Sequence, residues 1–410
     1  MDVDEPIAAA EITPPLFDPP RRALLLVFFT IFLDILGFGI LVPVIPFLVQ
    51  PFDSSALIIG LLTVSFSISQ FIAAPILGVM SDRWGRRPVL LISILGAALA
   101  YAAFGAATAL WVFFAARIVD GLTGGNISTA QAYIADVSKP EDRAKNFGLI
   151  GAAFGAGFVL GPAIGGIMSH ISLAAPAYLA GALCLLSAIF GYFFLPESLP
   201  QSRRRTRPFT LRDFNPFSQL LDFIKNPVLA MNFTSLLMMG LAMNALRSNF
   251  AVYARESLHY DASHVGYLYT YLGVIVVFTQ MVLVRRIAPK FGDRKTALIG
   301  FTAMMIGFLW MATEPDLFQI ICIMPLIAVG NGLCFPTITA MSSHAVQDDQ
   351  QGGVMGAQQS VNSMAMIIGP FVAGWAFDHI SMGAPYAIAA GFLLIGLLLS
   401  LRHLRKISAA

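Results

Sequence analysis

Three ionisable residues lie inside long apolar stretches of the sequence, where a charge is costly and usually functional. Asp34 stands about eleven residues into the first stretch, roughly 16 Å along a helix. Arg117 and Asp120 are three residues apart in the fourth stretch, so they share one helical face. We predict a buried group that takes up and releases protons. The alternatives are a structural hydrogen bond for Asp34 and a simple ion pair between Arg117 and Asp120.

A charged turn, Gly78–Leu91, separates the second and third apolar stretches. Its glycines permit close helix packing and a tight turn, and Asp82 is expected to cap a helix N-terminus in the other half of the chain. Arg86 can reach Asp136, which ends the fourth stretch. We predict a gate at one membrane face, with simple anchoring as the alternative for Arg83 and Arg87. The gate residues are Gly78, Asp82, Arg83, Gly85, Arg86, Arg87 and Asp136.

The composition requires a membrane around most of the chain. The sequence is 57% hydrophobic and 12% charged, with a mean hydropathy of +0.76, more apolar than soluble domains. About twelve stretches are long enough to span a bilayer. They fall near 23–49, 56–80, 88–106, 110–136, 147–168, 174–195, 228–253, 265–287, 296–313, 317–342, 353–376 and 384–401. The predicted fold is an all-α integral membrane protein with two pseudo-symmetric six-helix bundles.

The domain organisation follows from these stretches and from charge. We expect a disordered tail (1–20), a first bundle (21–195), a basic linker (196–227), a second bundle (228–403) and a short C-terminal tail (404–410). All lysines and arginines except Arg117, Arg247 and Arg255 fall on the side that carries both termini. Because cytoplasmic loops are enriched in basic residues, this side is predicted to be cytoplasmic.

The two halves repeat each other in sequence. The segment 84–87 recurs as 291–294, and Gly161-Pro162 recurs as Gly369-Pro370 at nearly the same offset. Parallel duplication of a six-helix bundle is an architecture of secondary transporters, whose binding sites lie between the bundles near the membrane midplane.

The charged turn resembles the cytoplasmic loop signature of the major facilitator superfamily, in the form found in twelve-span drug:proton antiporters. The stretch 33–39 is similar to the first-helix signature of that group, and 117–121 with Gly124 and Gly125 is similar to its fourth-helix motif. The nearest branch resembles the tetracycline-resistance efflux proteins. The resemblance implies proton-coupled efflux of amphipathic small molecules by alternating access, with Arg117 taking part in proton transfer.

A glycine pattern in the fifth stretch resembles the antiporter motif of exporters. Small residues permit close helix contact, and we expect this face to meet a helix of the other bundle, although generic small-residue packing is an equal alternative on spacing alone. The motif residues are Gly157, Gly161, Pro162, Gly165 and Gly166.

Polar residues in the second half are the candidates for a substrate cavity, and each could instead bond to a neighbouring helix. They are Asn244, Arg247, Gln280, Asn331, Gln358 and Asn362. Arg247 has no acid in the core of its own helix, so it is expected to face an aqueous cavity. Ala100, a residue near Ala303, and Val276 stand where the tetracycline branch carries acids and a histidine. We therefore expect a less acidic cavity than tetracycline itself requires.

Other function classes fit less well. The three cysteines lie in apolar stretches, and no metal-ligand pair, nucleophile elbow or Walker loop occurs. We expect no enzyme activity, cofactor, metal or nucleic acid, but a monomer in the cell membrane that meets lipid, protons and a small-molecule substrate. The alternative is a symporter or uniporter for a metabolite, an anionic solute or a lipid. A membrane enzyme and a non-transporting receptor are weaker alternatives.

Overall fold

The computed structural model describes residues 20–124, 126–138, 143–204, 220, 223–346 and 350–407. Nearly all of the predicted N-terminal tail, much of the linker and the end of the C-terminal tail lie outside these residues. Within the described part the chain forms helices joined by short turns, without strands, which confirms the all-α prediction.

The first half contains eight helices within the described residues. Ser55 caps α3, its side chain accepting a hydrogen bond from the Ile58 N–H at 3.4 Å. The helices are α1 (Pro20–Leu41), α2 (Ile45–Val49), α3 (Ala56–Trp84), α4 (Arg86–Gly105), α5 (Leu110–Thr123), α6 (Asn126–Val137), α7 (Arg143–Ser169) and α8 (Ala175–Phe194).

The second half follows a short 3₁₀ turn, η2 (Gln201–Arg203). Asn226 and Asp316 cap α10 and α13 with their side chains. The elements are α10 (Pro227–Leu258), α11 (Ala262–Phe278), the π-helical segment η4 (Thr279–Leu283), α12 (Val284–Met311), α13 (Leu317–Ser343), α14 (Gln351–His379) and α15 (Ala384–Ile407).

Three expected spans differ in detail from the prediction. The span at 110–136 is broken, because α5 ends at Thr123 and α6 begins at Asn126, so neither piece is long enough to cross alone. The spans near 265–287 and 296–313 follow each other in one helical run that turns sharply at Gly292. For these two reasons the described chain shows 10 separate helical stretches of membrane-spanning length rather than twelve.

Gly292 has φ 78° and ψ 159°, and Gly85, between α3 and α4, has φ 108° and ψ 158°. Such angles are open to glycine and strained for other residues. The sequence repeat is thus also a repeat of backbone conformation, and each half contains the same sharp turn between two of its long helices.

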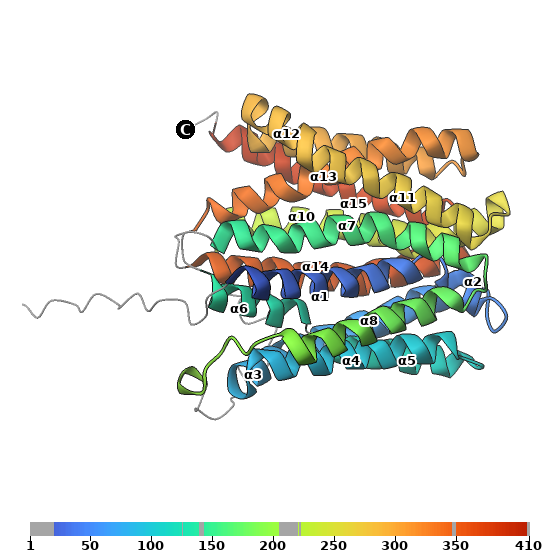
Figure 1. Cartoon of the computed structure of the whole chain (residues 1–410). Helices are drawn as coiled ribbons and strands as arrows, with labels where there is room; N and C mark the ends of the chain where they lie inside the picture. The colour runs from blue at the N-terminus through green and yellow to red at the C-terminus, as the bar shows by residue number, and fades with distance from the viewer. Residues whose placement is uncertain are drawn as a thin grey trace, which may run out of the picture.

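Both ends of the described chain lie on one side of the molecule, here named the terminal face (Figure 1). Away from this face the bundles touch: the α3 helix at Gly60 approaches the Pro370 carbonyl of α14, and Gly266 of α11 fits against Gly166 of α7. Toward the terminal face, Gly78 and Gly151 border open space. Within the described residues, the buried core joins the two bundles near the opposite face and not at the terminal face.

Candidate functional site

A buried ion pair lies inside the first bundle. Arg117 Nη1 on α5 donates to Asp120 Oδ2 at 3.2 Å, and the two side chains are only 4% and 7% exposed. The guanidinium also lies 4.8 Å from the centroid of the Phe104 ring and 5.8 Å from that of Phe66. The neighbours that the spacing predicted are in contact, in surroundings that strengthen an electrostatic interaction.

Asp34, half-buried on α1, lies close enough to Asp120 for the two carboxylates to interact electrostatically. The cluster thus contains two acids and a single arginine, Arg117. The Arg117 guanidinium engages the Asp120 carboxylate, and Asp34 is a second carboxyl whose charge acts on the same pair.

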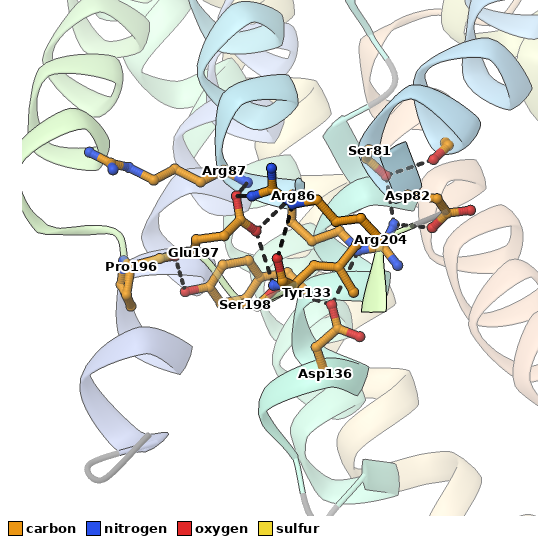
Figure 2. A network of polar contacts seen from close by, with 12 residues as sticks. Ser81, Asp82, Arg86, Arg87, Tyr133, Asp136, Pro196, Glu197, Ser198 and Arg204 are labelled. Carbon is orange, nitrogen blue, oxygen red and sulfur yellow. Dashed lines mark hydrogen bonds and ion pairs between the residues drawn. The ribbon is translucent and has the colours of Figure 1, made fainter. Parts of the chain in front are cut away.

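The charged turn forms a polar network on the terminal face (Figure 2). Arg86 Nε donates to Asp136 Oδ2 at 3.2 Å, the contact that the sequence predicted. Its Nη1 donates to Asp82 Oδ1 at 2.5 Å and to Ser81 Oγ at 2.7 Å. A single guanidinium therefore joins the end of α3, the start of α4 and the end of α6.

Asp82 was predicted to cap a helix of the other bundle, and this prediction is wrong for the structure described here. Its carboxylate is taken by Arg86 in the same bundle, and its side chain is 43% exposed. The physical reason is the separation of the bundles at this face, which leaves the neighbouring Gly78 with open space beside it. Arg87 instead packs along the bundle surface, donating to the Tyr192 carbonyl with its guanidinium 5.7 Å from that ring. Arg83 also has an interaction partner.

Glu197 completes the network and was missed by the sequence analysis (Figure 2). Its carboxylate accepts from the backbone N–H groups of Arg86 at 2.8 Å and Arg87 at 3.3 Å, and it pairs with Arg204 at 3.8 Å. An anion at the first turn of α4 is favoured by the helix dipole. The available signal was an acid directly after the sixth apolar stretch, in a chain with few acids.

The glycine motif packs mainly within the first bundle, which corrects the expected partner. A Cβ at Gly157 would meet Ile35 at 2.7 Å, one at Gly161 would meet Gly39 at 2.7 Å, and one at Gly165 would clash with the Ile40 carbonyl, all on α1. Only Gly166, together with the Pro162 carbonyl, faces α11 of the other bundle. Spacing of four residues sets one face of α7 against α1.

A second polar contact closes the face opposite the termini. Asp378 of α14 accepts hydrogen bonds from the Ser55 hydroxyl at 2.6 Å and from the backbone N–H groups of Ala56 at 3.0 Å and Leu57 at 2.8 Å. A carboxylate of the second bundle thus caps α3 of the first. Asp378 was not predicted as a site residue, because it lies just beyond the end of the apolar stretch 353–376.

Arg255 adds a further bridge at this face. Its guanidinium donates to the carbonyls of Pro46 at 3.2 Å and Ser54 at 3.1 Å, and it pairs with Glu256 at 2.8 Å. Pro46 and Ser54 belong to the first bundle and Arg255 to the second. The side of the chain with fewest arginines therefore uses one of them to hold the bundles together.

The polar residues of the second half are dispersed. Asn244 is buried and donates to the Gly240 carbonyl of its own helix at 2.9 Å, whereas Gln280 is exposed within the π-helical segment. Asn362 is exposed, Asn331 is half-buried, and Gln358 is half-buried with a buried Nε2 that has no hydrogen-bond partner. These side chains do not form one hydrogen-bonded group.

Arg247 is half-buried on α10, and its guanidinium carbon lies 4.9 Å from the ring centroid of Phe158 on α7. It therefore reaches across the interface between the bundles. In the described residues no group of three or more His, Cys, Asp or Glu side chains could hold a metal ion. The cysteines are free.

Comparisons with known proteins agree with this architecture. The Major Facilitator Superfamily model matches residues 27–292 and 233–408. The tetracycline resistance protein, class C, of Escherichia coli is 35% identical over 86% of this chain and 89% of its own length. Multidrug resistance protein 2 of Bacillus subtilis is 27% identical over 90% of this chain and 91% of its own.

A solved structure of a bacterial homologue of the human lysosomal transporter Spinster, in an inward-facing and occupied conformation, shares the fold. Its TM-score is 0.73 at 15% identity, covering 95% of this chain and 98% of that one. The family model and the class C relative each span most of the chain. Together with the two helical bundles, they establish that this protein is a multi-pass membrane transporter of the Major Facilitator Superfamily.

Proposed function

We propose that the protein exports amphipathic small molecules across the cytoplasmic membrane in exchange for protons. The observation that carries this proposal is the group of Asp34, Arg117 and Asp120, two carboxyls and one guanidinium close together within the first bundle. Ionisable groups are costly in an apolar bundle, and proton transfer is one of the functions for which transporters keep them there. The relatives' names, tetracycline resistance and multidrug resistance, favour a drug-like cargo.

The terminal face is assigned to the cytoplasm. Within the described residues it carries Arg83, Arg86 and Arg87, and the basic residues 285, 286, 290, 294 and 295 around the second turn. Basic residues remain on the cytoplasmic side during insertion. With this orientation the separated ends of the bundles open inward, so the described state can accept substrate from the cell interior.

The exposed apolar surface supports the placement of the chain in a bilayer. Large apolar side chains project outward along the helices, including Leu99 at 69%, Trp111 at 71% and Phe318 at 75% exposure. Exposed apolar surface on this scale matches a hydrocarbon solvent. We assign the protein to the bilayer as a single chain with both termini inside.

We derive the transport cycle from the polar contacts at the two faces. The opposite face is held by Asp378 and Arg255, and the terminal face carries the Arg86 network. When substrate is bound, the bundles rock so that the terminal face closes and the opposite contacts break. A proton then enters from outside and binds the buried acids, and its return inward supplies the drive, about 2.3 kcal/mol per charge per 100 mV for the electrical part.

The test uses inside-out membrane vesicles loaded with a pH-sensitive dye. A panel of drugs is added to vesicles whose lumen is acidic. The proton gradient should drive drug uptake, and each substrate should release protons from the lumen. Asp34→Asn is expected to abolish the exchange, while Asp293→Asn, which removes an acid from the second turn outside the buried group, leaves it intact. Unchanged exchange by Asp34→Asn contradicts its coupling role.

The same vesicles separate export from import. A symporter moves substrate and protons in the same direction, so substrate entering an inside-out vesicle would acidify the lumen, whereas exchange makes the lumen more alkaline. A uniporter gives substrate flux without proton movement. Proton release on substrate addition is the outcome that the exporter requires.

A further inference from the structure

The arginine of α10 has a position that proton exchange does not explain. Arg247 is half-buried, and its guanidinium lies over the ring of Phe158 in the other bundle at 4.9 Å. Among the described residues, the ion pairs within 4.0 Å do not include it. A cation–aromatic contact offsets only part of the cost of withdrawing a charge from water.

Phe158 belongs to a line of aromatic rings in the first bundle, in which Phe154 also stacks on it with centroids 6.1 Å apart. The Phe158 centroid is 6.4 Å from that of Phe38, which is 6.0 Å from that of Phe66. We call Phe158, Phe38 and Phe66 the aromatic strip. Arg117 lies 5.8 Å from the Phe66 ring, so an arginine stands at each end of the strip. Arg117 is neutralised by Asp120, whereas no ion pair between described residues includes Arg247.

Neighbouring contacts hold the helix without using the guanidinium. The Tyr269 hydroxyl donates to the backbone carbonyl of Arg247 at 2.9 Å, and Asn244 bonds to its own helix at 2.9 Å. The donors of Arg247 are therefore left for a ligand. Guanidinium groups bind carboxylates with two parallel hydrogen bonds, and they do so most strongly where water is scarce.

We infer that Arg247 selects the substrate: the transporter carries planar aromatic anions, whose acidic group pairs with Arg247 while the ring packs on the aromatic strip. The inference rests on the proposed function for the use of this site, and it adds the chemical class of the cargo. Such a ligand would link α10 of the second bundle to α1 and α7 of the first.

Binding to the purified full chain in detergent tests the inference without a gradient. The probes are 2-naphthoate and its neutral isostere 2-naphthamide, measured by titration calorimetry. The unaltered protein should bind the acid at least about tenfold more tightly. Arg247→Gln should remove this preference, Arg247→Lys should keep part of it, and Arg286→Gln, an exposed arginine of α12 with the same charge change, should behave as the unaltered protein.

Three results would overturn the inference: no binding of 2-naphthoate at millimolar concentration, equal affinity for the two probes, or a retained preference in Arg247→Gln. The comparison of two probes on the unaltered protein needs no variant, so a misfolded variant does not obscure it. Acid-selective binding without proton exchange in vesicles would contradict the proposed function alone. Proton exchange without acid-selective binding would contradict this inference alone.

Discussion

At the scale of single residues, the buried pair of Arg117 and Asp120 is the most consequential contact. Both side chains are almost completely withdrawn from water, so each depends on the other for its charge to be tolerated. Asp34 is half-buried, and in the proposed function it is the acid that exchanges a proton. The pair is best understood as a fixed ion pair that sets the environment of Asp34.

Removing one partner of this pair should cost more than removing both. Asp120→Leu leaves a buried arginine without its carboxylate and is expected to lower stability by about 3–5 kcal/mol. The double variant Arg117→Met/Asp120→Leu should recover most of that loss, since replacing a buried pair by apolar residues is often neutral. Thermal melting of the purified variants in one detergent measures both. A double variant less stable than Asp120→Leu would show that the arginine is held by something else.

Two of the contacts could be predicted from the sequence alone. Arg117 and Asp120 share a helical face, and Arg86 has few acids within reach on its own side of the membrane. Asp82 could not be placed, because its partner depends on whether the bundles are together or apart, and a sequence does not specify the state. Glu197 and Asp378 bind backbone N–H groups, which carry no residue-specific signal.

At the scale of elements, the two glycine turns have the same backbone but different surroundings. Gly85 and Gly292 both have φ in the positive range. A Cβ at Gly85 would clash with the carboxylate of Glu197, whereas a Cβ at Gly292 would meet nothing within 4 Å. The first turn is closed by an acid that binds the start of α4, and the second is open.

Alanine substitutions should separate these two turns. Gly292→Ala is expected to cost only backbone strain, about 1–3 kcal/mol. Gly85→Ala carries the same strain and also displaces Glu197, so it should melt at a lower temperature. Glu197→Gln, which removes the charge but keeps the shape, should fall between Gly85→Ala and the unaltered protein. Equal melting temperatures for the two alanine variants would contradict a structural role for Glu197.

Periodicity predicted the helices well and their partners poorly. Apolar length marked nearly every span, but Gly124, interpreted as part of a motif, also stands at the end of α5, where the helix breaks before α6. The glycines at 157, 161 and 165 were correctly placed on one face, yet that face meets α1 rather than the other bundle. Spacing identifies a face, and only tertiary packing decides what covers it.

At the scale of the whole molecule, the buried core of the described residues joins the two bundles at one end only. The hydrophobic core of the second bundle continues into Val44, Phe47, Ala56 and Ile59 of the first, all near the face opposite the termini. Toward the terminal face, Gly78 of α3 and Gly151 of α7 border open space. The state is therefore defined by contacts on one side only, and changes to either side should shift it.

Asp82→Arg should favour the state described here. Asp82 is the one acid of α3, and its side chain is 43% exposed at the terminal end of that helix. When the terminal face closes, a positive charge there would meet the positive end of a helix N-terminus rather than neutralise it. In a background without the three cysteines, maleimide labelling of Gly151→Cys from the terminal side should increase. Unaltered labelling would contradict a gating role for Asp82.

Asp378→Ala should move the same reporter in the opposite direction. The substitution removes the cap that joins α14 to the start of α3, and loss of a side-chain cap costs about 1 kcal/mol, which changes a two-state ratio about fivefold. Because this cap exists only while the opposite face is closed, the lost energy falls on the inward-open state, and labelling of Gly151→Cys should decrease. Asp316→Ala is the matched control, since Asp316 caps α13 at 2.9 Å within its own bundle and should lower stability without changing the labelling. If both alanine variants reduced labelling equally, the effect would reflect general destabilisation, and the bridge through Asp378 would have no part in setting the conformational equilibrium.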